Sequence, residues 1–280
     1  MKNILTTILM GLALFLNPDA SYSQTTNLIS FNIRYDNTSD TINNWNKRKA
    51  SLAALIQHYD ADIVGIQEGL HHQVDYLNSA LKGYSFVGVG RDDGKQKGEY
   101  SAIFYNASTF EVLKTNTFWL SETPEKVSVG WDASLERICT YALFKNTMTK
   151  KQFWVFNTHF DHRGKQARVH SAELIYKKIR EINTANLPVI LMGDLNLTPD
   201  TEPIQYLKKY LTDAMGISKK PFYGPIGTFN GFDQERIMEN RIDYIFVNNV
   251  EILSYTHIDD RMPNNMHISD HLPVMATIKN

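Results

Sequence analysis

Two kinds of apolar pattern alternate along the chain. Short runs in which most residues are apolar occupy residues 27–33, 61–68 and 187–194, and runs of this length are typical of strands buried on both faces. Two longer segments, from about Trp45 and from Lys165 to Ile182, repeat apolar residues at helical spacing and predict amphipathic helices. A shorter helix is predicted at 71–81, and further strands at 84–89, 101–105, 111–120, 137–144, 152–158, 241–247, 250–257 and 273–278. This interleaving predicts an α/β protein in which two packed sheets are flanked by helices.

The segment from Leu187 to Pro199 is the most informative of these runs. Its apolar residues predict a buried strand that Gly193 ends, so that Asp194 and Asn196 follow at the carboxyl end, where layered α/β proteins usually place a site. Alternate positions of an extended chain point the same way. We therefore expect a carboxylate and an amide to face one small volume, suited to a metal ion, a water molecule or a phosphate.

Composition and charge limit the kinds of partner. The chain has 280 residues, of which 42% are hydrophobic and 21% charged, as in an ordinary soluble globular protein. Lys and Arg number 29 against 30 Asp and Glu, a net charge of -1, so no general positive charge attracts nucleic acid or an anionic membrane. Any polyanion must be bound by local charge or a metal. No linker-like composition divides residues 24–280, which predicts a single domain.

The N-terminus has the pattern of a secretory signal peptide. Lys2 precedes an apolar run from Ile4 to Leu16, and small residues suited to cleavage follow up to Ser23. We expect residues 1–23 to direct export to the periplasm or the extracellular space. A retained membrane anchor is the alternative, although the run is short for a membrane span. Cys139 is the only cysteine; it cannot form an internal disulfide and is expected to be buried.

Polar residues collect at five predicted strand ends: Asn32, Glu68, His159 with Asp161, Asp194 with Asn196, and Asp270 with His271. Any one of them alone is typical of a turn or a helix cap, but the recurrence indicates one shared pocket. Carboxylate and amide oxygens without thiolates suit Mg²⁺, or Mn²⁺, better than a structural zinc. Histidines beside aspartates suit proton transfer or phosphate stabilisation. Together these groups favour metal-assisted hydrolysis of a phosphoester.

The same residues lie in motifs of a known family. Over Asn27–Lys279 the chain resembles the endonuclease/exonuclease/phosphatase superfamily, which includes abasic-site endonucleases, neutral sphingomyelinases, inositol polyphosphate 5-phosphatases and deadenylases. The motifs, in order, are Ser30-Phe-Asn32, Ile66-Gln67-Glu68, Asn157-Thr-His159-Phe-Asp161, Gly193-Asp194-Leu-Asn196, Arg241-Ile-Asp243 and Ser269-Asp270-His271. The resemblance implies a four-layer α/β sandwich, two mixed sheets packed face to face with helices outside. The histidine of Asn157-Thr-His159 is more similar to the phosphatase, sphingomyelinase and deadenylase branches than to the abasic endonucleases.

The resemblance also implies a role for each motif residue. Glu68 would be the principal metal ligand, with Asn32 and Asp270 beside it. Asp194 would orient or deprotonate the attacking water, while Asn196 would help to hold the phosphate. His271 would contact the phosphoryl oxygens, and Asp243 would fix the imidazole of His271. His159 would stabilise the transition state. Asp161 would support the metal, His159 or the substrate.

The substrate is left open by the sequence. Arg137 and Arg163 are candidates for phosphate binding, although each is equally consistent with a solvated arginine. The expected partner is a small phosphorylated molecule or a nucleic-acid phosphodiester, hydrolysed by a monomer with no obligate protein partner and no stable membrane span. One alternative is a sphingomyelinase-like enzyme at a membrane surface, for which Phe118-Trp119-Leu120 and Trp131 are candidate interfacial aromatics, or else pack against the sheet. A second alternative is a non-catalytic member that binds a phosphorylated or glycan ligand.

Overall fold

Two six-stranded sheets form the centre of the structure. The computed structural model describes residues 25–279, so the predicted signal peptide lies outside the described residues. In spatial order, the first sheet contains β11 (Glu251–His257), β12 (Val274–Lys279), β1 (Thr25–Asn32), β2 (Ile63–Gln67), β4 (Ile103–Asn106) and β3 (Tyr84–Val87). The second contains β5 (Phe110–Trp119), β6 (Ile138–Asn146), β7 (Gln152–His159), β8 (Val189–Asp194), β10 (Asp243–Asn248) and β9 (Thr212–Asp213).

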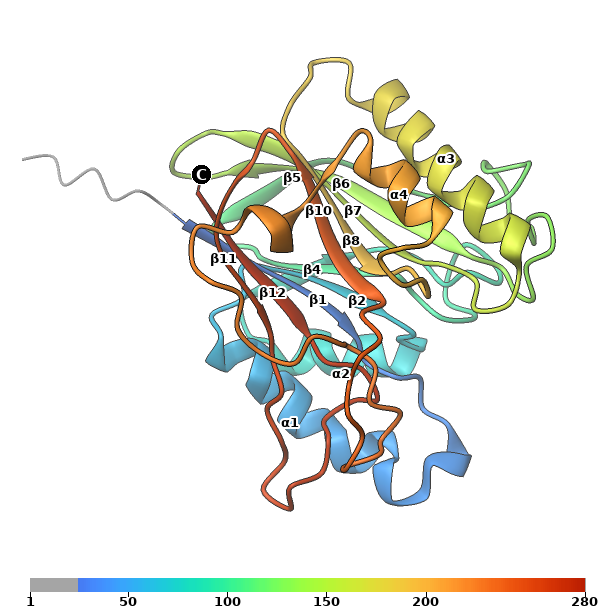
Figure 1. The fold of residues 1–280 in the computed structure, drawn as a ribbon. Coiled ribbons are helices and arrows are strands. Elements are labelled where there is room, and N and C mark those ends of the chain that lie inside the picture. The colour runs from blue at the N-terminus through green and yellow to red at the C-terminus, as the bar shows by residue number, and fades with distance from the viewer. Residues whose placement is uncertain (1–24, 280) are drawn as a thin grey trace, which may run out of the picture.

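Helices cover the outer face of each sheet (Figure 1). The first sheet is covered by α1 (Trp45–His58) and α2 (His71–Ala80), and the second by α3 (Lys165–Ile182) and α4 (Glu202–Lys208). Short 3₁₀ helices follow β1 and β9, at Thr38–Asn43 and Ala214–Ile217. The order helix, sheet, sheet, helix confirms the predicted four-layer α/β sandwich.

Three apolar clusters fill the spaces between these layers. One lies between the two sheets and includes Phe144, Val155 and Ile190. A second joins the first sheet to α1 and α2, and a third joins the second sheet to α3 and α4. Because both sheets are buried on both faces, their central strands are mostly apolar, as the sequence pattern indicated.

Two parallel strand pairs determine where polar side chains can meet. β1 pairs in parallel with β2, and β7 with β8; each parallel pair requires a long crossover connection, which α1 and α3 supply. The antiparallel neighbours β12 and β10 begin where β1 and β8 end. Four carboxyl ends and two amino ends are therefore gathered along one edge of the sandwich.

A buried polar contact links the two sheets beneath that edge. Asn157 of β7 donates from Nδ2 to the carbonyl oxygens of Ile66 and Ala102, at 2.8 and 2.9 Å, and accepts from Gln67 Nε2 at 2.7 Å. Gly65 makes room for this contact, because a Cβ atom there would lie 2.8 Å from the Asn157 carboxamide. Satisfied polar groups of this kind fix the relative position of packed layers.

Most predicted elements are confirmed, and the differences lie in loops. The helix predicted at Lys165–Ile182 has those bounds, whereas α4 and β9 were not predicted. The segment 88–98, which is rich in glycine, forms turns with its own backbone hydrogen bonds. The aromatic run Phe118-Trp119-Leu120 is buried, which confirms packing over exposure at an interface, and Cys139 is buried and free.

Candidate active site

The predicted site residues come together where both sheets end. Asn32 ends β1, Glu68 follows β2, His159 ends β7 and Asp194 ends β8. The strand register places His159 opposite Asp194, and Asp194 opposite Asp243 at the start of β10. The segment with Asp270 and His271 precedes β12 and lies against the end of β1, where Ser269 Oγ donates to Asn32 O at 2.7 Å. Two sheets therefore contribute to one site.

Asp194 lies at the centre of this arrangement. Its Oδ2 accepts from Asn32 Nδ2 at 3.0 Å, and lies 3.4 Å from His159 Nε2 and 3.8 Å from His271 Nε2. Its Oδ1 accepts from the backbone N–H of Asn196 at 2.9 Å. The carboxylate thus contacts groups from β1, β7 and the segment before β12.

Gly193 allows β8 to bring Asp194 to this position. It has a φ of +149°, and a Cβ atom there would lie 2.0 Å from Thr158 O on β7. Only glycine tolerates both the conformation and the close approach. The glycine predicted to end the strand instead lies within it, one residue before its end.

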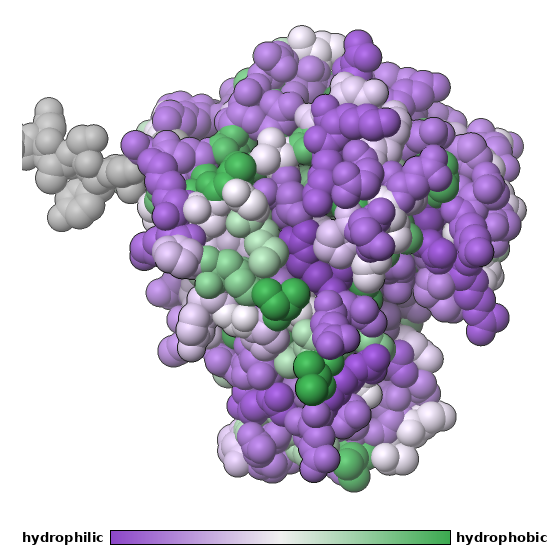
Figure 2. All heavy atoms as spheres, in the orientation of Figure 1, coloured by the Kyte–Doolittle hydropathy of each residue, from purple (hydrophilic) through white to green (hydrophobic). Residues whose placement is uncertain are grey.

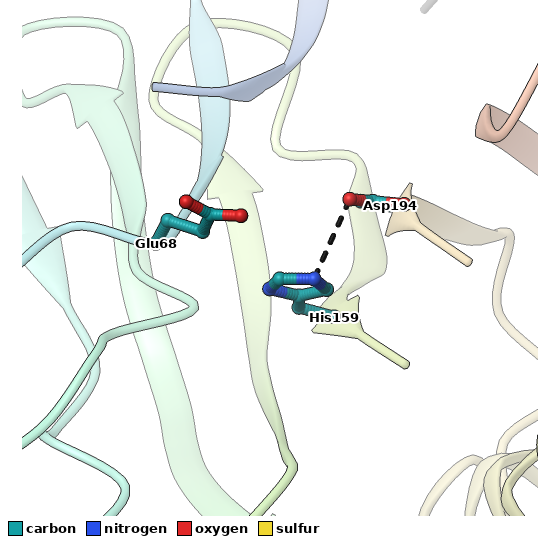
Figure 3. Close-up of side chains that lie close together, drawn as sticks. All are labelled: Glu68, His159 and Asp194. Carbon is teal, nitrogen blue, oxygen red and sulfur yellow. Dashed lines mark ion pairs between the residues drawn. The ribbon is translucent and has the colours of Figure 1, made fainter. Parts of the chain in front are cut away.

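Glu68 is held at the metal side of the site. Asn32 Nδ2 donates to its Oε1 at 3.0 Å, and the Tyr35 backbone N–H donates to its Oε2 at 3.1 Å. Glu68, His159 and Asp194 point toward one another (Figure 3), and each offers a ligand atom within 4.8 Å of the others. Two carboxylates and an imidazole at this spacing suit a divalent cation.

The charges around Asp270 are a second indication of a cation site. Burial, together with the nearby Glu68 carboxylate, raises the pKa of Asp270 to about 6, although His271 opposes the shift. Arg34 Nη1 lies 3.6 Å from Asp270, but Arg34 also pairs with Asp40 at 3.0 Å. A divalent cation would relieve the repulsion between Glu68 and Asp270, so the residues present fit the metal that the motifs imply.

His271 and Asp243 form a buried ion pair opposite the metal side. His271 Nδ1 donates to Asp243 Oδ2 at 2.9 Å, and Asp243 Oδ1 has no hydrogen-bond partner. Burial lowers the pKa of His271, but the carboxylates of Asp243 and Asp194 outweigh it and raise that pKa well above its ordinary value. The imidazole is therefore a cation whose Nε2–H points toward the centre of the site.

His159 has the opposite charge state. Burial, with help from Arg137 and Arg91, lowers the pKa of His159 well below its ordinary value, so the ring is neutral. Asn196 Nδ2 donates to His159 Nε2 at 3.1 Å and to Phe160 O at 3.0 Å. Nε2 is consequently the acceptor, and the ring proton is on Nδ1.

Asp194 has the pKa expected of a general base. Burial, together with the Asp243 carboxylate, raises the pKa of Asp194 to about 7, although the neighbouring His271 and Asn32 oppose the shift. A carboxylate whose pKa lies near neutral pH can accept a proton efficiently at that pH. Asp194 and Asn196, predicted to face one volume, do so with His159 between them.

A cavity of about 400 Å³ opens above these residues. Arg137 lines it, and its Nη1 is buried without a hydrogen-bond partner, so this guanidinium has an N–H group available for an anion. Sequence reasoning missed several other lining residues, among them Arg34, Tyr35, Glu99, Leu135 and Phe229. Arg34 and Tyr35 closely follow the Ser30-Phe-Asn32 motif, but Glu99 had no signal beyond its place after the glycine-rich segment.

Two predicted substrate-binding residues lie outside the set that lines the cavity. Asp161 is buried, accepts from the backbone N–H groups of Arg163 and Gly164 at 2.9 and 2.7 Å, and contacts Arg137 Nε at 3.4 Å. It therefore fixes the turn after β7 and orients Arg137. Arg163 is exposed to solvent, because that turn directs its side chain away from the cavity.

The fold agrees with that of known proteins similar in sequence. A model of the Endonuclease/Exonuclease/phosphatase family matches residues 29–271, and the chain belongs to this family, whose members are divalent-metal-dependent hydrolases of the phosphatase and nuclease type. A Bacteroides thetaiotaomicron mannosyl-6-phosphatase of known structure is 39% identical, over 91% of this chain and 100% of that one, with a TM-score of 0.87. A family member from Bacteroides vulgatus is 40% identical over 91% and 99%, with a TM-score of 0.86. An uncharacterized mimivirus protein is 27% identical over 82% of this chain and 91% of its own length.

Proposed function

We propose that this protein is an exported, Mg²⁺-dependent phosphatase that hydrolyses phosphate monoesters of sugars, with Mn²⁺ as an alternative ion. The observation that carries the proposal is the 400 Å³ cavity lined by Asp194, His271, Glu68 and Arg137. Its volume suits a single small ligand. The similar Bacteroides protein, which is named a mannosyl-6-phosphatase, supports a hexose 6-phosphate as the substrate class.

Each residue has a distinct task in the proposed reaction. Asp194 orients a water molecule and takes its proton as the water oxygen attacks phosphorus. The ester P–O bond breaks on the opposite side, and the sugar oxygen leaves and takes up a proton from solvent water. The His271 cation, held by Asp243, stabilises the phosphoryl oxygens, and Arg137 Nη1 adds a further hydrogen bond. Neutral His159 lies beside the phosphate, and Asn196, whose amide donates to His159 Nε2 and Phe160 O, positions this imidazole instead of holding the phosphate itself. A cation at Glu68, Asn32 and Asp270 would offset the negative charge that develops on the phosphoryl group.

The test is a panel of phosphoesters with the purified protein and Mg²⁺. We expect mannose 6-phosphate and glucose 6-phosphate to be hydrolysed with a higher kcat/KM than bis(p-nitrophenyl) phosphate, single-stranded RNA or sphingomyelin. Asp194→Asn is expected to lower kcat/KM by about 10²- to 10⁴-fold, the usual contribution of a general base. Exposed Asp200 provides the matched control, Asp200→Asn. Faster hydrolysis of a phosphodiester than of every sugar phosphate would overturn the substrate class.

Action at a membrane surface has less support. Phe118, Trp119 and Leu120 are buried, and Trp131 packs on His170 with ring centroids 5.0 Å apart. On the face shown in Figure 2, apolar residues form small patches separated by polar ones. Among residues 25–279, no helix has the length and apolar character needed to cross a membrane.

Export and oligomeric state complete the proposal. Residues 1–23 would be removed as a signal peptide, and the mature chain would act as a monomer. The mass of the protein recovered after expression with its native N-terminus tests cleavage after Ser23. Light scattering tests the monomer; a stable dimer would refute that part of the proposal alone.

A further inference from the structure

The glycine-rich segment 88–98, which precedes β4, is held by hydrogen bonds and leads into the site. Gly90 N donates to Lys95 O at 2.9 Å, and Arg91 N donates to Glu99 O at 3.1 Å. Trp119 Nε1 on β5 donates to Arg91 O at 2.8 Å, which fastens the segment to the second sheet. A Cβ atom at Gly90 would lie 2.2 Å from Lys97 O, so the turn depends on this glycine. The segment ends by placing Glu99 at the catalytic cavity.

The Glu99 carboxylate is held in one orientation by Arg91. Arg91 Nη1 donates to Oε2 at 2.6 Å and Nη2 donates to Oε1 at 2.9 Å, while the Arg91 and Glu99 side chains are 9% and 16% exposed. A two-point contact of this kind fixes the plane of the carboxylate. It uses one lone pair of each oxygen and leaves one on each for another donor.

No other protein donor among residues 25–279 is seen within hydrogen-bonding distance of those oxygens. His159 Nδ1 lies 3.9 Å from Oε2, beyond hydrogen-bonding distance. Glu99 therefore presents two aligned acceptors in a cavity it shares with Glu68, His159 and Asp194. Neither the proton transfer to Asp194 nor the stabilisation of phosphate by His271 uses them.

We propose that Glu99 is a specificity-determining residue, which accepts hydrogen bonds from hydroxyl groups of the substrate's sugar while the catalytic residues hold its phosphate. The inference rests on the proposed function. Two fixed carboxylate oxygens match neighbouring hydroxyl groups, which are donors that a sugar has and an aryl phosphate lacks. The negative charge also disfavours a second phosphate group at this wall, as in a nucleic-acid strand.

The experiment compares selectivity rather than rate. The ratio of kcat/KM for mannose 6-phosphate to that for p-nitrophenyl phosphate is measured for the wild type and for Glu99→Gln. We expect the ratio to fall about 10- to 100-fold, as for loss of a hydrogen bond to a charged group. Glu99→Asp, which keeps the charge but withdraws the oxygens, is expected to lower the ratio in the same direction. Glu111→Gln, at an exposed glutamate on β5, is the matched control.

Each outcome of this experiment is decisive. The inference is overturned if this ratio of kcat/KM values stays within about threefold of the wild type in both Glu99 variants. That holds whether hydrolysis of the two substrates is unchanged or equally slowed, because Glu99 would then act through His159 or not at all. Thermal unfolding of both variants verifies that they are folded. If the wild type hydrolyses no sugar phosphate, the proposed function itself is refuted, and the role of Glu99 with it. If it does and the ratio is insensitive to Glu99, only the role of Glu99 fails.

Discussion

The buried pair of His271 and Asp243 yields a prediction of a stability loss whose size depends on pH. In Asp243→Asn the carboxylate opposite His271 Nδ1 becomes an amide of almost the same shape, which can still accept the imidazole hydrogen bond. Only the charge is removed. The change therefore separates the electrostatic contribution of Asp243 from its role in orienting the ring.

The size of that contribution follows from the 2.9 Å separation. At an effective dielectric constant of about 20, two unit charges at this distance attract by about 6 kcal/mol. Asp194, 3.8 Å from Nε2, remains to stabilise part of the positive charge. We therefore expect a loss of about 3–5 kcal/mol from the free energy of unfolding, the range found when a buried pair loses one partner.

The loss is expected only where His271 is charged. Its pKa is raised in the folded protein, so its contribution to stability is fully present below the unfolded pKa of about 6.5 and disappears as the pH rises through the folded pKa. Asp243→Asn should thus be most destabilising near pH 6, and less so as the pH rises. Metal-free protein, unfolded by urea at several pH values and followed by circular dichroism, provides the measurement. A cost that is independent of pH, or that grows with pH, would refute the reasoning.

Three further predictions concern other residues. Glu68→Gln is expected to weaken Mg²⁺ binding, measured by titration calorimetry, by at least about 10-fold, or about 1.4 kcal/mol, and unchanged affinity would remove Glu68 from the metal site. Gly193→Ala is expected to destabilise the protein by more than about 2 kcal/mol, whereas Gly216→Ala, where an added Cβ atom meets nothing within 4 Å, should change stability little. Burial lowers the pKa of His257 to about 4. As the pH falls below about 6.5, His257 therefore binds a proton in the unfolded chain before it does so in the folded protein. The free energy of unfolding should decrease by up to about 3 kcal/mol by pH 4. His257→Asn should show a smaller loss in urea unfolding at pH 7 and pH 4, and an equal loss would contradict the shift.

Long periodic elements and the strand-end residues could be predicted from the sequence. In the helix Lys165–Ile182 the apolar residues recur at helical spacing, and β8 is apolar because both of its faces are buried. Asp194 could be placed at a strand end for the same reason. The contacts of Asp194 with Asn32 and His271 could not be predicted from the sequence, because they depend on how the two sheets pack against each other.

The unpredicted features depend on contacts between distant segments. α4 has seven residues, too few to show a helical period, and it forms against α3 in the folded protein. Glu99 faces the cavity because Arg91 and Trp119 fix the turn before it. Asp161 and Arg163 lie in a motif, yet the turn after β7 uses the Asp161 carboxylate for its own backbone. A motif therefore locates a segment, whereas the direction of each side chain depends on local hydrogen bonds.

The division of the site between two sheets has a consequence for when the chain becomes active. The proposed metal ligands lie in or beside strands of the first sheet, while Asp194 and His159 end strands of the second, and Asn157 joins the two halves. β12, which begins three residues after His271, pairs with β1 from the other end of the chain. No partly synthesised or unfolded chain can therefore contain a working site. On the proposed route of export as an unfolded precursor, the sugar phosphates of the cytoplasm are spared, because hydrolytic activity arises only after translocation and final folding.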